Sequence, residues 1–183
     1  MNENVKFTGR KSIRLKGYDY GSEGLYFLTL CCYMNRHLFG NVVQGQMQLN
    51  NAGKVAYAMW LEIPKHFPEV KLHDFVVMPN HVHGIIEIVK VDSKIDSKKL
   101  AEQHSMAVKQ EVMLRSPSRT VGSIVRGYKI GVTKWFRQNS FVDVVWLRNY
   151  YEHIIRDDEA YNNISEYIRN NPRKWQEDKF NKV

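Results

Sequence analysis

Long hydrophobic runs and cysteines spaced for disulfide bonds are both missing from this chain of 183 residues. Its apolar runs are only a few residues long, whereas a transmembrane helix needs roughly 18, so we expect no contact with a membrane. Segment 1–16 mixes polar and basic side chains and lacks the apolar stretch of a signal peptide. The only cysteines are the neighbours Cys31 and Cys32, which cannot form a disulfide framework. These features predict a cytoplasmic protein whose thiols are reduced and buried.

Acidic side chains are scarce relative to basic ones. The chain has 19 Asp and Glu against 27 Lys and Arg, and a formal net charge of +8. The basic excess is concentrated in two segments, 1–17 and 109–140. Clustered positive charge is typical of proteins that bind a polyanion, because phosphates release counterions on binding. Nucleic acid is the partner that this pattern favours, and a merely basic protein is the alternative.

The length and the apolar fraction of 43% predict one globular domain. We expect a basic N-terminal arm at about 1–17 and a mobile insertion at about 91–118, which is polar and rich in Lys and Ser. The order of the elements between them is that of a ferredoxin-like α+β fold, βαββαβ, with a four-stranded antiparallel sheet. Helices would cover one face of the sheet, the other face would be open, and a further C-terminal helix would follow. The expected strands are 25–33, 70–78, 82–89 and 142–146, the expected helices are 52–63, 121–135 and 157–171, and a short hairpin is expected within 35–48.

Two histidines stand out at the turn between the two middle strands. Alternate side chains of a strand point to the same side, so His81 and His83 project together and could share one metal ion. Gly84 removes a side chain next to the pair, which would let a ligand approach. The alternative is two unrelated histidines at the surface of a hairpin.

The last expected helix carries a tyrosine and an amide on one face. Tyr167 and Asn171 are four residues apart and therefore stack in space. They could supply a nucleophile and a third metal ligand side by side. The alternative is that Tyr167 borders the apolar stripe of Ile164 and Ile168 and only packs there.

Three ordered motifs resemble one known family. Segment 75–84 (FVVMPNHVHG) looks like the HUH motif of single-tyrosine transposases. Segments 145–157 (VWLRNYYEHIIRD) and 165–172 (SEYIRNNP) are similar to the C-terminal signature of the REP-associated tyrosine transposase branch. Segments 14–20 and 38–40 also match that branch, so the resemblance extends over most of the chain.

The resemblance implies a DNA endonuclease and strand transferase that acts on single-stranded DNA with hairpin or palindromic repeats. It implies a divalent metal, Mg²⁺ or Mn²⁺, held by His81, His83 and Asn171, and Tyr167 as the nucleophile that forms a 5′-phosphotyrosine intermediate. Relatives act as monomers or as homodimers, and both states stay open for this chain. The residues that we expect to contact DNA are Arg14, Lys16, Arg126, Lys129, Lys134, Arg137 and Arg148.

Two other functions compete with the enzyme. A non-catalytic single-strand binder with the same sheet would need the aromatic RNA-recognition motif on its central strands, where this sequence has His81 and His83. A decayed transposase would bind DNA without cutting it, and the presence of all the expected catalytic residues argues against that.

Overall fold

The structure is a computed structural model that describes residues 21–89 and 120–181. Its centre is a four-stranded antiparallel sheet in the order β4-β5-β1-β6, which is the strand order of a ferredoxin-like βαββαβ fold. The predicted fold class is therefore confirmed. The strands of this sheet are β1 Gly24–Cys31, β4 Val70–Val77, β5 His81–Ile88 and β6 Tyr151–Ile155.

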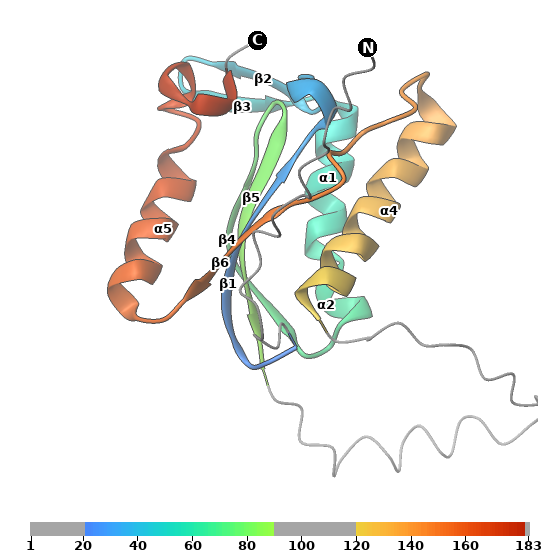
Figure 1. Ribbon diagram of the computed structural model, residues 1–183. Coiled ribbons are helices and arrows are strands. Elements are labelled where there is room, and N and C mark those ends of the chain that lie inside the picture. Colours follow the sequence, from blue (N-terminus) through green and yellow to red (C-terminus); the bar gives the residue numbers. More distant parts are fainter. Residues whose placement is uncertain (1–20, 90–119, 182–183) are drawn as a thin grey trace, which may run out of the picture.

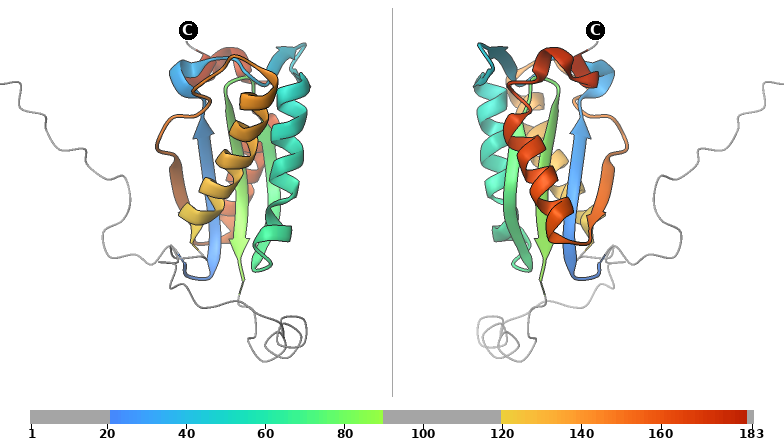
Figure 2. Two further views of the ribbon diagram at one scale, coloured as in Figure 1. Left: turned by 90° about the vertical axis from the view of Figure 1, so that its right-hand side faces the viewer. Right: turned by 90° about the vertical axis from the view of Figure 1, so that its left-hand side faces the viewer.

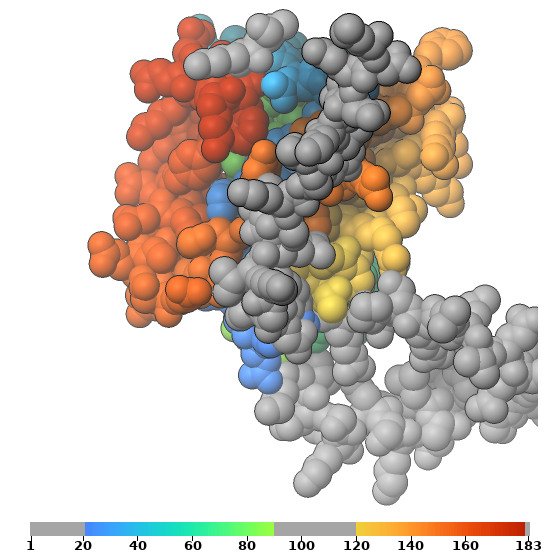
Figure 3. Space-filling model, in the orientation of Figure 1, coloured from blue at the N-terminus to red at the C-terminus, as the bar shows by residue number. Residues whose placement is uncertain are grey.

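Helices lie on both sides of the sheet (Figures 1 and 2). On one face lie α1 Asn51–Leu61, α2 Ile63–His66 and α4 Val121–Asn139. On the other face lies α5 Asp158–Asn170. The space-filling view shows α5 and α4 on opposite flanks of the molecule (Figure 3). The short elements are the hairpin β2 Gly40–Val43 with β3 Gln46–Leu49, and the 3₁₀ turns η1 Tyr33–Asn35, η2 Trp175–Glu177 and η3 Lys179–Asn181.

The three long helices begin where the sequence provides a capping side chain. Asn50, Thr120 and Asp157 each accept a hydrogen bond from the backbone N–H three residues later. Such caps satisfy N–H groups that the first turn of a helix leaves without partners. The predicted hairpin within 35–48 and the helices near 52–63, 121–135 and 157–171 are all present.

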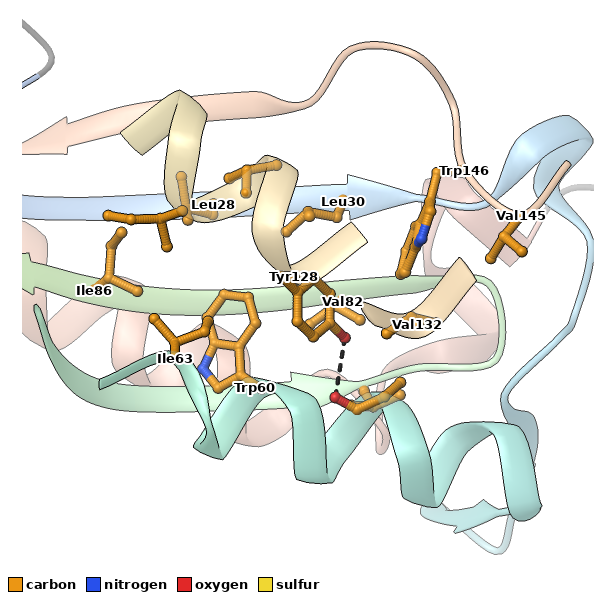
Figure 4. Packing of buried hydrophobic residues seen from close by; sticks show 14 of the residues in the cluster. Leu28, Leu30, Trp60, Ile63, Val82, Ile86, Tyr128, Val132, Val145 and Trp146 are labelled. Atoms are coloured by element: carbon orange, nitrogen blue, oxygen red, sulfur yellow. Dashed lines mark hydrogen bonds between the residues drawn. The ribbon is translucent and has the colours of Figure 1, made fainter. Parts of the chain in front are cut away.

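The main core lies between the sheet and the α1/α4 layer (Figure 4). Trp60 of α1 and Tyr128 of α4 meet there edge to face, and the Tyr128 hydroxyl donates to the Ala56 carbonyl oxygen at 3.1 Å. Gly84 of β5 faces this core, and a Cβ added there would overlap the Trp60 indole. Gly84 therefore allows close packing against Trp60. The prediction that it leaves space for a ligand beside the histidines is wrong.

One prediction about the strands is wrong. Segment 142–146 is no strand: within the described chain only one isolated bridge, Cys32 with Trp146, occurs there, and Val144 is exposed. The fourth strand is β6, which pairs with β1 alone. The segment VDVVW meets the chain just beyond β1 through that one bridge and places Val145 and Trp146 in the main core, whereas YEHII runs along the edge of β1.

The second face of the sheet is partly covered. Helix α5 packs on β4 and β5 through a small cluster centred on Ile85, Ile155 and Ile168, so the expectation of a fully open face is wrong. No helix within the described ranges is long and apolar enough to cross a bilayer. The predicted arm 1–17 with Arg14 and Lys16, and the predicted insertion 91–118, lie outside the described residues.

Candidate active site

The two histidines lie on the α5 face of the sheet. The register of β5 against β1 places His83 opposite Thr29 and His81 opposite Cys31, while the alternate residues Val82 and Ile86 enter the main core. His81 is 0% exposed and His83 is 2% exposed. The idea that these imidazoles lie at the surface is wrong, because the C-terminal helix and the 3₁₀ turns cover them.

The protonation of His81 follows from its neighbour Asn80. The Asn80 amino group donates to the carbonyl oxygens of Asn35 at 3.1 Å and Phe180 at 2.7 Å. Its Oδ1 must therefore accept, and it lies 2.8 Å from His81 Nδ1. Nδ1 then carries the proton, and Nε2 keeps a free lone pair. Nε2 is buried and has no hydrogen-bond partner among the residues that the structure describes.

His83 connects the sheet to the tyrosine of α5. Its Nδ1 lies 2.8 Å from Thr29 Oγ1, and its Nε2 lies 3.1 Å from the Tyr167 hydroxyl oxygen. The Phe27 ring stacks on the imidazole with centroids 5.3 Å apart, and the centroids of His81 and His83 are 4.4 Å apart. The structure thus brings together the histidine pair and Tyr167, which are 84 residues apart in sequence.

Asn171, directly after α5, completes the group. Its amino group donates to Asp178 Oδ2 at 3.0 Å. Its Oδ1 is buried and finds no hydrogen-bond partner in the described chain. The Asn171 side chain lies close enough to influence the pKa of both His81 and Tyr167. The predicted nucleophile and the three predicted metal ligands therefore lie in one place.

Burial sets the charge state of these groups. It lowers the pKa of His81 to about 4 and holds the pKa of His83 well below the ordinary value, so both imidazoles are neutral near pH 7. Burial also raises the pKa of Tyr167, and the carboxylate of Asp178 adds to that effect. The site contains lone pairs and a neutral phenol, with no positive charge on the imidazoles.

The donor set fits a divalent cation. His81 Nε2 and Asn171 Oδ1 are both acceptors, both buried, and neither has a donor in the described chain. Leaving such atoms unpaired costs about 1–3 kcal/mol each, and a cation would satisfy them. Two imidazoles and one amide oxygen are few ligands for a metal ion. Within 21–89 and 120–181 no group of three His, Cys, Asp or Glu side chains lies close enough together to hold one. The remaining ligands would come from water or substrate, as Mg²⁺ usually requires.

A cavity of about 430 Å³ opens onto His83, Tyr167 and Asn171. Phe27 and Thr29 of β1 form one side of it. The C-terminal turns provide the rest of its lining, which consists of Lys174, Glu177, Asp178 and Lys179. Two of these four are cations and two are anions, so this wall of the cavity carries both charges.

A second, basic groove lies on the other side of the sheet, along α4. It has a volume of about 680 Å³ and runs between α4 and the segment before β6. None of the described residues that line it is acidic. Its lining includes all five predicted DNA contacts that the structure describes, Arg126, Lys129, Lys134, Arg137 and Arg148, together with Ile130 and Tyr150.

Lys129 differs from the other cations of this groove. Its ammonium donates to the carbonyl oxygens of Leu147 at 2.8 Å and Asn149 at 3.1 Å. Burial lowers its pKa to about 8. Lys129 therefore holds the loop that carries Arg148 and Tyr150, a role that the sequence did not indicate.

Several residues of the site were not singled out from the sequence. Asn80 sets the tautomer of His81, Thr29 forms a hydrogen bond with His83, and Asp178 accepts a hydrogen bond from Asn171. Asn80 lies inside the PNHVH segment, so its position was a usable signal. Thr29 and Asp178 lie outside the motifs, and only the strand register and the C-terminal turn bring them to the site.

No protein-family profile matches the sequence. Among solved structures, a REP-associated tyrosine transposase bound to a REP hairpin superposes with a TM-score of 0.57 at 19% identity, over 90% of this chain and 74% of that one. A candidate transposase from Deinococcus radiodurans reaches a TM-score of 0.39 at 16% identity, over 86% of this chain and 95% of that one, a similarity that supports no conclusion. The chain thus has the fold of a REP-associated tyrosine transposase, which confirms the sequence resemblance at the level of the fold.

A curated protein of Haemophilus influenzae, which is described as uncharacterized, is 48% identical over 171 residues, covering 93% of this chain and 92% of that protein. The chain belongs to the same family as this Haemophilus influenzae protein.

Proposed function

We propose that the protein is a metal-dependent transposase-type enzyme that cleaves and rejoins single-stranded DNA at hairpin or palindromic repeats, in the cytoplasm. The observation that carries the proposal is the contact of the Tyr167 hydroxyl with His83 Nε2 at 3.1 Å, next to two buried acceptor atoms without partners. A nucleophile and a cation site in contact are what phosphoryl transfer to tyrosine requires.

In the proposed reaction the Tyr167 oxygen attacks a DNA phosphorus and loses its proton to solvent. The bond from phosphorus to the 3′ oxygen breaks, and that oxygen takes a proton and leaves as a free 3′-hydroxyl. The product is a 5′-phosphotyrosine, which a second 3′-hydroxyl can attack to rejoin the strands. Mg²⁺ or Mn²⁺, held by His81, His83 and Asn171, would neutralise the charge that develops on the phosphate.

The protein's own groups prepare the nucleophile. Tyr167 is 41% exposed, so a DNA strand can reach its hydroxyl. Phe27 contacts the Tyr167 ring edge to face at 6.2 Å and also stacks on His83, which fixes both rings relative to each other. Lys174 and Lys179 line the same cavity and would hold the phosphate.

The basic groove along α4 is the proposed path of the DNA away from the tyrosine. Helix α4, which lines the groove, and helix α5, which carries Tyr167, lie on opposite faces of the sheet (Figure 2), so one DNA molecule that touches both must pass around an edge. The β6 edge is the one we propose, because the loop with Arg148 and Tyr150 leads directly into β6.

Covalent trapping tests this function. The full chain is incubated with single-stranded DNA containing the repeats that flank its own gene, with Mn²⁺ or Mg²⁺, and analysed by denaturing gel and peptide mass spectrometry. We expect an adduct with the unchanged chain and none with Tyr167→Phe, because phenylalanine cannot form a phosphate ester. Tyr161→Phe is the matched control on the same helix. Its hydroxyl contacts His73 at 3.1 Å instead of the histidine pair, and its adduct should persist.

Two results would contradict the proposal. An adduct with Tyr167→Phe would show that another residue is the nucleophile. An unchanged chain that binds hairpin DNA but traps none of it with either metal would favour the non-catalytic binder or the decayed transposase.

A further inference from the structure

We propose that Asp178 is a positioning residue that orients the Asn171 amide so that its oxygen, and not its amino group, faces the two histidines. This inference rests on the proposed metal site. Asp178 belongs to the turn between η2 and η3, outside helix α5, which carries Tyr167 and ends directly before Asn171.

The need for such a residue follows from the chemistry of an amide. The two ends of an asparagine side chain have nearly the same shape, so only its hydrogen-bond partners select one orientation. Asn171 is 2% exposed, so bulk water cannot make that selection. Asp178 Oδ2 lies 3.0 Å from Asn171 Nδ2, and a carboxylate can only accept. The Asn171 amino group must therefore face Asp178, which leaves Oδ1 as the buried acceptor.

Asp178 is itself held in place by a second hydrogen bond. Its Oδ1 accepts from the backbone N–H of Phe180 at 2.8 Å. The carbonyl oxygen of Phe180 accepts from Asn80, the residue that sets the tautomer of His81. One chain of polar contacts thus runs from Asn171 through Asp178, Phe180 and Asn80 to His81, and it fixes the lone pairs of two proposed ligands at once. Outer groups of this kind commonly orient metal ligands.

Two other roles for Asp178 predict different outcomes. As a direct ligand it would join the histidines, but no group of three His, Cys, Asp or Glu side chains in the described ranges is placed to hold a metal. As a mere negative charge it would be equivalent to Glu177, its neighbour on the wall of the same cavity. Glu177 is therefore the matched control.

The decisive variant is Asp178→Asn. Its single carbonyl oxygen can keep the turn by accepting from Phe180, and its amino group then faces Asn171. The Asn171 amide would rotate and present its amino group to the metal, so we expect Mn²⁺ affinity, measured by titration calorimetry on the full chain, to fall about 10–100-fold. The melting temperature without metal should stay close to that of the unchanged chain, and Glu177→Gln should bind Mn²⁺ normally.

A swap of the two side chains provides the rescue. In the double variant Asn171→Asp with Asp178→Asn, the carboxylate at 171 accepts from the new amino group and still offers an oxygen to the metal. We expect this double variant to bind Mn²⁺ as well as the unchanged chain does.

The outcomes separate this inference from the function on which it rests. If the unchanged chain binds no Mn²⁺, the proposed metal site itself fails. If it binds Mn²⁺ and Asn171→Ala weakens binding but Asp178→Asn does not, Asp178 does not position Asn171. If the swap gives no rescue, or if Glu177→Gln loses as much affinity as Asp178→Asn, the effect of Asp178 is one of charge and the orientation role is wrong.

Discussion

The two faces of β5 are formed by alternate residues of one short strand, yet their surroundings differ. Val82, Gly84 and Ile86 face the α1/α4 layer and belong to a continuous apolar core. His81 and His83 face α5, where the apolar cluster is much smaller and is centred on Ile85. Most of the apolar core lies on one face and the candidate catalytic groups lie at one end of the other, so the candidate site takes little from the main core.

The largest effects should come from neighbouring positions on the α5 face. His83→Gln removes a proposed metal ligand, so we expect metal-dependent cleavage to be lost, while the free energy of unfolding changes by only about 1 kcal/mol, the usual size of a hydrogen-bond loss. Ile85→Ala, two residues further on, is the matched variant. It should retain metal binding and lose about 2–5 kcal/mol of stability, since Ile85 is fully buried. Cleavage assays and urea unfolding of both variants measure the contrast, and a His83→Gln chain that cuts normally would refute the metal site.

A smaller effect is expected from the opposite face. Gly84→Ala adds a methyl group against the Trp60 indole and within 3.0 Å of Phe75 Cβ. Overpacking of this kind costs about 1–3 kcal/mol. The free energy of unfolding should fall by that amount, while cleavage below the unfolding transition stays normal. Normal stability together with lost cleavage would mean that the two faces are not separate in function.

The smallest effect concerns the basic groove and is read from salt dependence. For a single-stranded ligand, each lost phosphate contact should reduce the slope of log affinity against log salt by about 0.7. We expect this change for Lys134→Gln and for Arg137→Gln. Lys129→Gln should weaken DNA binding without changing the slope by that amount, because its ammonium is engaged with the carbonyl oxygens of Leu147 and Asn149. Equal slopes for all three variants and the unchanged chain would show that the groove does not carry the DNA.

Much of the fold and of the candidate site could be predicted because it depends on the spacing of residues within single strands and helices. The two-residue period of β5 put His81 and His83 on one side, and the apolar stripe of α4 gave a helix that the structure confirms. The four-residue spacing also placed Tyr167 and Asn171 together at the end of α5.

The failures share one cause, which is that the deciding contact is made by residues outside the local pattern. β6 is a strand only because β1 offers it an edge. Asp178 orients Asn171 only because the chain turns back after η2.

The contact of Gly84 with Trp60 also determines how the strands can be aligned. A β-strand that shifts by one residue against its neighbour turns every side chain to the other face. Such a shift of β5 would push His83 or Ile85 under the indole, where not even a Cβ has room, and would carry both imidazoles into the apolar layer. A shift by two residues would restore the faces but would still place a larger side chain under Trp60. The glycine therefore fixes the register: the pairing that leaves room for the Trp60 indole is also the pairing that places both imidazoles on the α5 face, with His83 in contact with Tyr167.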